Sequence, residues 1–251
     1  MRYHFPERRA ASTSKRLLTT SENSMTIQDE LILEQIQIGP MENFTYLVGC
    51  QRTREVAIVD PAWDIKSLMD VIGEKDYKLT AALVTHYHPD HCGGSFGQNN
   101  VAGVAELLGE SSVKVYANKL EADGLKKVTS ISDNDIAKVE SGDKLKIGDV
   151  EIEFLHTPGH TPGSQCFKVK QTLVSGDTLF INGCGRVDLP GSDIDEMYHS
   201  LKKLASLPDE TLLLPGHNYG HVPHATMEET KQQNVYMRIP NIESWRMMLQ
   251  N

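Results

Sequence analysis

The stretch Ala81–His91 reads AALVTHYHPDH, and the interpretation of the whole chain starts from it. Its first four residues are apolar, and its last six contain three histidines and one aspartate. A short apolar run of this kind is typical of a buried strand, whereas such a dense polar cluster is poor material for a core. Imidazoles and carboxylates are ordinary ligands of divalent metal ions. The stretch therefore predicts a metal site at the carboxyl end of a strand.

Three further segments carry the same kinds of side chain, each directly after an apolar strand candidate. They are His156–Gly163 (HTPGHTPG), Ser175–Thr178 (SGDT) and Pro215–Tyr219 (PGHNY). Glycine and proline at these strand ends permit the turns that aim ligands inward. In the first of these segments, His156 and His160 are competing candidates.

Together the four segments offer more ligands than one tetrahedral ion needs. They supply five histidines and two aspartates: His86, His88, Asp90, His91, His160, Asp177 and His217. Such a set fits two divalent ions about 3.5–4 Å apart with one bridging carboxylate. Zinc is the first expectation, and iron and manganese also suit these ligands. Two such ions would leave the site positive beyond its ligands, which favours a hydroxide and an anionic or polarised carbonyl substrate.

The apolar pattern predicts two groups of strands, each followed by helices. In the first group we expect an antiparallel meander of three strands, Leu31–Ile36, Phe44–Gly49 and Glu55–Asp60. Two further strands are expected at Leu79–Val84 and Val113–Tyr116. The helices of this group are expected at Ile65–Ile72 and Val101–Leu108. In the second we expect a hairpin of Lys144–Ile147 and Val150–Leu155, strands Cys166–Val169, Thr172–Ser175 and Thr211–Leu214, and helices Ile194–Leu207 and 224–238. Residues 119–140 give no clear pattern. Two sheets packed together with helices outside are expected.

Composition excludes some classes of protein. The chain has 251 residues, 39% of them hydrophobic, and a net charge of −9, which argues against a general nucleic-acid binder. No apolar run approaches the roughly 18 residues of a membrane span. The four cysteines form no C-x-x-C pair, so a cysteine zinc site is not expected and a reducing compartment is the simpler interpretation.

The first 24 residues differ from the rest because they are rich in arginine, serine and threonine. This composition suits a transit peptide, a disordered leader, or an extension upstream of a start at Met25. We therefore expect residues 1–24 to be a leader and residues 25–251 a single domain. The expected location is the cytoplasm, or a mitochondrion or plastid if the leader is a transit peptide.

The order of motifs resembles the metallo-β-lactamase superfamily. The motifs are T-H-x-H-x-D-H-x-G-G, P-G-H-T-P-G, S-G-D-T-L-F and P-G-H, and the match covers about residues 31–222. The resemblance implies an α/β (α+β) fold, the αββα sandwich, with a metal site at one edge. It implies that one ion is held by His86, His88 and His160. It further implies that the second is held by Asp90, His91 and His217, and that Asp177 bridges them. In the family pattern the ligand follows Pro-Gly, which selects His160 over His156.

Within the superfamily the chain looks most like glyoxalase II. The similar segments are Ser175–Phe180, Gly183–Arg186, Met197-Tyr198 and Pro215–Tyr219. The resemblance implies hydrolysis of a small-molecule thioester, an S-acylglutathione, by a hydroxide that bridges the metals, with Asp90 as catalytic residue. It implies that Arg186 and Tyr219 bind the glutathione part. No nucleic-acid or membrane partner is expected, and no residue pattern indicates an oligomeric state.

Two departures from glyoxalase II leave alternatives open. Val187-Asp188 replaces an aromatic pair, and Asn218–Asn251 is too short for the helical domain that glyoxalase II carries after its last metal histidine. The first alternative is a persulfide dioxygenase with one iron, whose C-G-R-x-D segment resembles Cys184–Asp188, although its P-A-H-D-Y differs from Pro215–Tyr219. The second is a non-catalytic metal-binding protein, which the intact ligand set disfavours.

Overall fold

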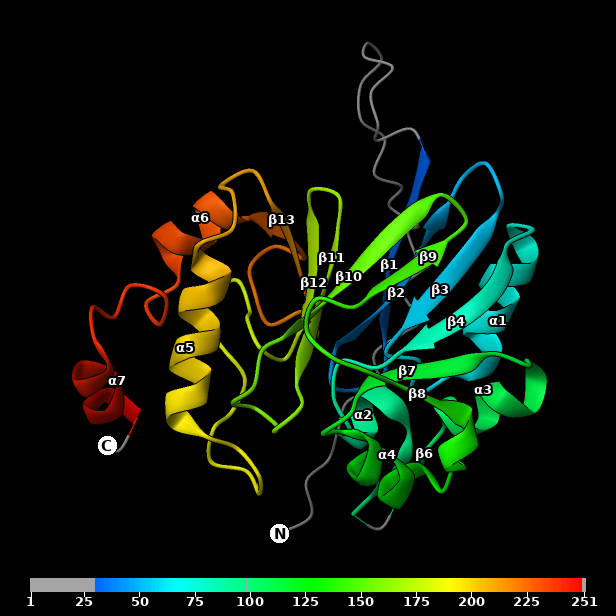
Figure 1. Cartoon of the computed structure of the whole chain (residues 1–251), viewed down its shortest axis with the longest axis horizontal. Helices are drawn as coiled ribbons and strands as arrows, with labels where there is room; N and C mark the ends of the chain where they lie inside the picture. The colour runs from blue at the N-terminus through cyan, green and yellow to red at the C-terminus, as the bar shows by residue number, and fades with distance from the viewer. Residues whose placement is uncertain (1–29, 98, 250–251) are drawn as a thin grey trace, which may run out of the picture.

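The computed structural model describes residues 30–97 and 99–249. The predicted leader, residues 1–24, and the alternative start at Met25 lie outside the described residues. Two mixed sheets run through the middle of the molecule, with α1, α3 and α4 on one side and α5, α6 and α7 on the other (Figure 1). This is the αββα sandwich that the motifs implied.

The first sheet has six strands in the order β1-β2-β3-β4-β7-β8. Their bounds are β1 Leu31–Ile38, β2 Asn43–Cys50, β3 Glu55–Val59, β4 Lys78–Leu83, β7 Lys114–Asn118 and β8 Ile136–Val139. The first three strands form the predicted antiparallel meander, and the other three continue the sheet in parallel. Parallel neighbours need crossovers, which contain α1 (Ile65–Glu74), α3 (Val104–Glu110) and α4 (Ala122–Thr129).

The second sheet also has six strands, in the order β14-β13-β12-β11-β10-β9. Their bounds are β9 Lys144–Ile147, β10 Val150–His156, β11 Gln165–Val169, β12 Thr172–Gly176, β13 Leu212–Pro215 and β14 Ala225–Thr226. Strands β12 and β13 are parallel, and α5 (Ile194–Ala205) crosses between them. Helices α6 (Met227–Gln233) and α7 (Ile242–Leu249) follow, and α7 packs on α5.

Three apolar cores separate the four layers, because alternate residues of a strand face opposite sides of its sheet. Phe44, Tyr46 and Val48 of β2 face the core between the two sheets. Leu47 of the same strand lies in the core beneath α1, α3 and α4. The third core lies between the second sheet and α5–α7, and includes the fully buried Trp245.

Two sequence predictions were wrong in extent. The predicted helix Val101–Leu108 begins only at Val104, because Asn99–Val101 is strand β6, which pairs with β5 (Gly94–Phe96). The predicted helix 224–238 is shorter than expected, because β14 occupies its start and α6 ends at Gln233. The sequence analysis did not predict the separate helix α7. The unreadable stretch 119–140 holds α4, a 3-10 turn at Asp133–Asp135 and β8.

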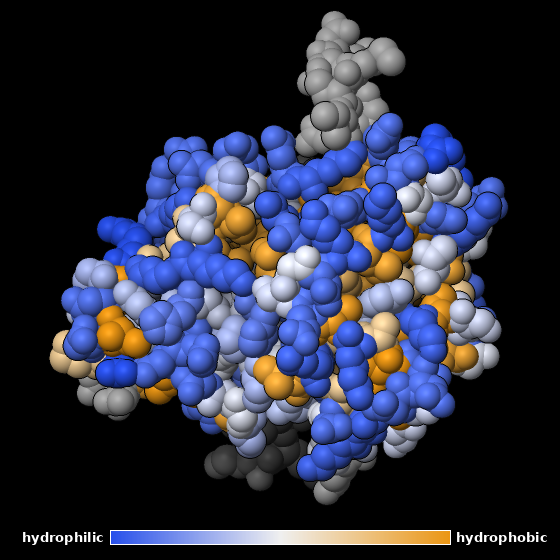
Figure 2. All heavy atoms as spheres, viewed as in Figure 1, coloured by the Kyte–Doolittle hydropathy of each residue, from blue (hydrophilic) through white to orange (hydrophobic). Residues whose placement is uncertain are grey.

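The described residues form no extended apolar area on the face drawn in Figure 2. On the face seen in Figure 2, hydrophilic residues surround separate small apolar patches. Among residues 30–97 and 99–249, no helix is both long enough and apolar enough to cross a membrane. All four cysteines are free.

Candidate metal centre

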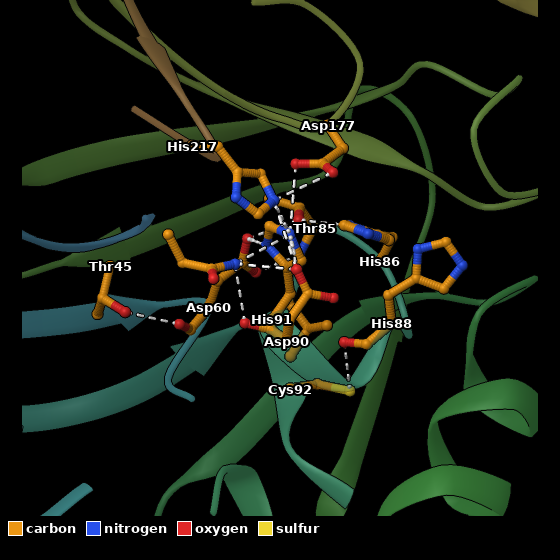
Figure 3. Close-up of polar contacts among 12 residues, drawn as sticks. Thr45, Asp60, Thr85, His86, His88, Asp90, His91, Cys92, Asp177 and His217 are labelled. Carbon is orange, nitrogen blue, oxygen red and sulfur yellow. Dashed lines mark hydrogen bonds and ion pairs between the residues drawn. The ribbon is translucent and has the colours of Figure 1, made fainter. Parts of the chain in front are cut away.

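All the predicted ligands lie just beyond the carboxyl ends of four strands. His86, His88, Asp90 and His91 follow β4 of the first sheet, and the last two belong to the short helix α2 (Pro89–Cys92). The second sheet supplies the other three: His160 follows β10, Asp177 follows β12 and His217 follows β13. Figure 3 shows His86, His91, Asp177 and His217 pointing toward one another across the two sheets.

One group of donors, the three-histidine half, consists of His86, His88 and His160, whose ligand atoms all lie within 4.8 Å of one another. His160 Nε2 lies 2.9 Å from His88 Nδ1. His160 Nδ1 donates to the carbonyl oxygen of Arg186 at 2.8 Å, so Nε2 is the ring nitrogen that faces the other histidines. Two nitrogens this close need a shared proton or a cation between them, which fits a metal ion.

His86 makes the strongest case for a cation in this half. Its Nδ1 lies 3.0 Å from Thr85 Oγ1, and that hydroxyl donates to Asp60 Oδ2 at 2.6 Å. The hydroxyl therefore accepts from Nδ1, which leaves His86 Nε2 without a proton. That nitrogen is buried and has no hydrogen-bond partner. Buried polar atoms are rarely unpaired, so this one marks a place where a ligand fits.

The second group, the carboxylate half, consists of Asp90, His91 and His217, which also lie within 4.8 Å of one another. His91 Nε2 lies 3.1 Å from His217 Nε2. The outer nitrogens of both rings are held: His91 Nδ1 lies 2.9 Å from Asp60 Oδ2, and His217 Nδ1 donates to Met41 O at 2.9 Å. Such outer partners are the usual supports of metal-binding histidines.

Asp177 touches both halves. Its carboxylate lies 3.3 Å from His91 Nε2, 3.4 Å from His217 Nε2 and 3.7 Å from His160 Nε2. A methyl group on Gly216 would stand 2.4 Å from Asp177 Oδ1 and would clash with it. Only glycine at this position lets the carboxylate of Asp177 keep its observed position. This explains the glycine in the motif Pro215–His217 in physical terms.

The electrostatics of the two halves are opposite. Burial, reinforced by neighbouring imidazoles, lowers the pKa of His86 well below its usual value and that of His88 to about 4. In the carboxylate half, burial by itself lowers the pKa of the histidines, but Asp177 and Asp90 outweigh it. They raise the pKa of His91 well above its usual value and that of His217 to about 9. Divalent cations bind neutral imidazoles and ionised carboxylates. His86 and His88 meet this condition as they stand, whereas a cation in the carboxylate half would take the place of the protons that His91 and His217 hold.

Sequence reasoning missed Glu121, a fully buried carboxylate that joins two of the ligand loops. It accepts from the backbone of Tyr87 at 2.8 Å, between His86 and His88, and from the backbone of Gly163 at 2.6 Å. The hydroxyl of Thr161, next to His160, donates to it at 2.9 Å. Glu121 lies in the stretch that showed no pattern, and no motif marks it.

The remaining predicted residues belong to neither donor group. A third group of potential ligands, His86, His91 and Asp177, joins the two halves, and His156 belongs to none of the three groups. Its Nε2 lies 2.9 Å from the carbonyl oxygen of Pro162. The guanidinium of Arg186 is 68% exposed and forms a bidentate pair with Asp188. Tyr219 is 54% exposed and stacks on the ring of His217, with 4.5 Å between centroids. Tyr219 thus contacts the carboxylate half directly, whereas Arg186 contacts the three-histidine half through its backbone oxygen.

Comparison with known proteins agrees with this geometry. A probable polyketide biosynthesis zinc-dependent hydrolase from Bacillus velezensis is 31% identical over 80% of this chain and 84% of its own length. A hydroxyacylglutathione hydrolase from a Polaromonas strain is 35% identical over 75% of this chain and 67% of its own.

Two solved structures are similar as well. ETHE1 from Myxococcus xanthus superposes with a TM-score of 0.75 at 26% identity, covering 88% of this chain and 90% of that one. The protein TTHA1623, solved in a di-iron-bound form, has a TM-score of 0.67 at 29% identity, covering 80% of this chain and 98% of its own.

The family comparison completes the assignment. Residues 38–217, which span the site from the meander to the last predicted ligand, match the pattern of the Metallo-beta-lactamase superfamily. The zinc-dependent relative and the donor groups agree with a metal-dependent hydrolase. The chain belongs to the metallo-beta-lactamase superfamily and is one of its metal-dependent hydrolases.

Proposed function

We propose that the protein hydrolyses small-molecule thioesters of the S-acylglutathione type at a centre that holds two divalent metal ions, in the first place zinc. The observation that carries the proposal is the position of Asp177 between two separate donor groups. A relative named hydroxyacylglutathione hydrolase and a relative solved with two irons support it.

In this proposal His86, His88 and His160 hold one ion. Asp90, His91 and His217 hold the other, and Asp177 is shared. Bound divalent cations supply positive charge that stabilises the oxyanion of acyl transfer, and they lower the pKa of water. The protein's task is to keep seven donors in place and in the right protonation state.

Asp90 is the proposed catalytic residue. Its carboxylate is nearly buried and lies 3.3 Å from His91 Nε2 and 3.4 Å from His217 Nε2. Burial raises its pKa, but the two histidines outweigh this and hold the pKa well below its usual value. An ionised carboxylate here orients the attacking water by accepting a hydrogen bond from it. A thiolate is a good leaving group, so no strong general acid is needed.

Arg186 and Tyr219 are the proposed contacts for the glutathione part. The guanidinium of Arg186 is exposed and already forms a fork with a carboxylate, that of Asp188. A glycine carboxylate of the substrate offers the same geometry and can take the place of Asp188. Tyr219 presents its exposed ring and hydroxyl beside His217.

The second candidate is a persulfide dioxygenase with one iron. It is favoured by the segment Cys184–Asp188, in which the arginine and the aspartate of C-G-R-x-D are paired. The two candidates differ in metal content, in oxygen consumption and in substrate, so one set of measurements separates them.

Metal analysis of the purified protein and turnover of S-lactoylglutathione test the proposal. A matched thioester without glutathione, S-lactoyl-N-acetylcysteamine, serves as the control for the carrier. We expect two equivalents of metal and release of thiol from both compounds, with the lower KM for the glutathione compound. One equivalent of iron with oxygen uptake on glutathione persulfide, and no thioester turnover, would overturn the proposal.

A further inference from the structure

A chain of side-chain hydrogen bonds enters the carboxylate half from outside the motifs. The indole Nε1 of Trp63 donates to Asn43 Oδ1 at 3.0 Å. The amide Nδ2 of Asn43 then donates to Asp90 twice, to the carboxylate Oδ2 at 3.0 Å and to the backbone oxygen at 3.1 Å. Asn43 is 2% exposed, so its amide depends on these partners and not on solvent.

The order of donors in this chain fixes the orientation of the Asn43 amide. An indole N–H can only donate, so the atom of Asn43 that faces Trp63 must be its oxygen. The NH₂ group must then face Asp90, where it supplies two hydrogens to two oxygens. A flipped amide would set N–H against N–H at Trp63 and oxygen against carboxylate at Asp90. The carboxylate of Asp90 is therefore held at a defined angle.

The backbone around Asn43 holds another member of the same half. Asn43 forms an isolated antiparallel bridge with His217, and Phe44 N donates to Gly216 O at 2.8 Å. Two residues earlier, Met41 O accepts from His217 Nδ1 at 2.9 Å. The start of β2 thus orients both a carboxylate and an imidazole of the carboxylate half. None of these contacts reaches His86, His88 or His160.

Trp63 is itself held in an unusual conformation. Its φ is +73°, a left-handed value that bulky residues rarely adopt. Its backbone N–H donates to Ala102 O at 2.8 Å. Its ring lies so close to Gly39 that a methyl group there would stand 2.5 Å from it. The contacts with Ala102 and Gly39 hold the strained backbone of Trp63 in a conformation that directs the indole N–H toward Asn43.

We propose that Asn43 is a positioning residue for the carboxylate half, and that Trp63 locks its amide in the orientation that Asp90 requires. By occupying one side of Asp90 Oδ2, the amide leaves the remaining lone pairs directed at the space shared with His91 and His217. This inference rests on the proposed two-ion site, because it assigns the residues an effect on one ion and not on the other.

The test is a Zn²⁺ titration of the purified protein against a competing chelator. His88→Ala leaves the carboxylate half intact and His217→Ala leaves the three-histidine half intact, so each background reports one affinity. Asn43→Ala removes the amide, and Trp63→Phe removes the indole N–H together with one ring of the indole, a loss of volume that the control below reproduces. The control is Trp245→Phe, which removes the other indole N–H of the chain, a buried donor to Ile194 O at 2.7 Å.

Asn43→Ala and Trp63→Phe are expected to weaken Zn²⁺ binding in the carboxylate half by about 10–100-fold, as is usual for outer partners of metal ligands. The three-histidine half keeps its affinity, and Trp245→Phe changes neither. Unchanged affinity in the carboxylate half, or equal weakening of both halves, would overturn the inference. If Asn43→Ala does not fold, Trp63→Phe decides alone. Wild-type protein that binds a single Zn²⁺ would overturn the two-ion proposal and this inference with it.

Discussion

The three-histidine half and the carboxylate half share Asp177 but are built differently. The three-histidine half is supported by a backbone carbonyl, a hydroxyl and the buried Glu121, and its members His86 and His88 have lowered pKa values. The carboxylate half is supported by the start of β2 and directly by Asp60, which reaches His86 of the other half only through Thr85. The histidines of the carboxylate half have raised pKa values. One half thus offers an ion neutral donors, while the other offers negative charge. The two ions should therefore respond differently to changes in the protein.

Removing Asp177, the proposed shared ligand, should weaken metal binding in both halves. In Asp177→Asn the carboxylate loses its charge and one of its oxygens, so both halves should bind Zn²⁺ more than about 100-fold more weakly, beyond the usual effect of an outer partner. The measurement is metal content after dialysis against a chelator, together with thioester turnover. Asp143→Asn, outside the metal-binding groups, is the control. Retention of either ion at full affinity would show that Asp177 does not serve both halves.

Removing Glu121 should weaken only the three-histidine half. In Glu121→Gln the new NH₂ group cannot accept a hydrogen bond, so at least one of the three donors it now satisfies is left unpaired. A buried unpaired donor costs about 1–3 kcal/mol. The loops that carry His88 and His160 should loosen, and Zn²⁺ affinity in the His217→Ala background should fall about 10-fold, at the lower end for outer partners.

Glu106→Gln is the matched control for this change. Glu106 also accepts from a backbone N–H, that of Gly103 at 2.7 Å, but at the start of α3. It should lower thermal stability without changing either affinity. If Glu121→Gln weakened the carboxylate half as much as the other, the two halves would not be independently supported.

The smallest effect is expected from Asp188→Asn, which frees Arg186 without touching either ion. The backbone oxygen of Arg186 supports His160, while its side chain is free to exchange partners in solvent. We expect metal content to stay the same and KM for S-lactoylglutathione to fall by a few fold, because Asp188 no longer competes for the guanidinium. KM for the N-acetylcysteamine thioester should not change. A rise in KM for both compounds would show that Asp188, and not Arg186, faces the substrate.

The sequence predicted two sheets with outer helices, and it marked the seven candidate donors, because strands and strand ends have local patterns. The division of the donors into two groups came only from the resemblance to the superfamily. Alternating apolar residues such as Phe44, Tyr46 and Val48 mark a strand, and polar clusters after Leu83 and Leu214 mark strand ends. The separation of Val101 from α3 was not predictable in this way, because its pairing with Gly94 decides it.

The supports of the metal centre escaped prediction for a different reason. Asn43, Trp63 and Asp90 are far apart in the sequence and meet only when the first sheet has folded. A single asparagine or tryptophan has no spacing that would mark it. Glu121 lies in a polar stretch with several other carboxylates, and only its burial in the folded protein distinguishes it from the exposed ones.

In the proposed two-ion centre, the split of the donors between two sheets would set the order in which a newly made chain acquires its metals. His91 and His217, whose Nε2 atoms end 3.1 Å apart, are separated by 126 positions along the chain. At about 5–20 residues per second, a ribosome needs on the order of ten seconds to add them. Throughout that interval the cluster around His91 exists without its partners. The three-histidine half can close first, once His160 has emerged. The carboxylate half needs His217, which follows β13, so a second ion could bind there only after most of the second sheet has been made.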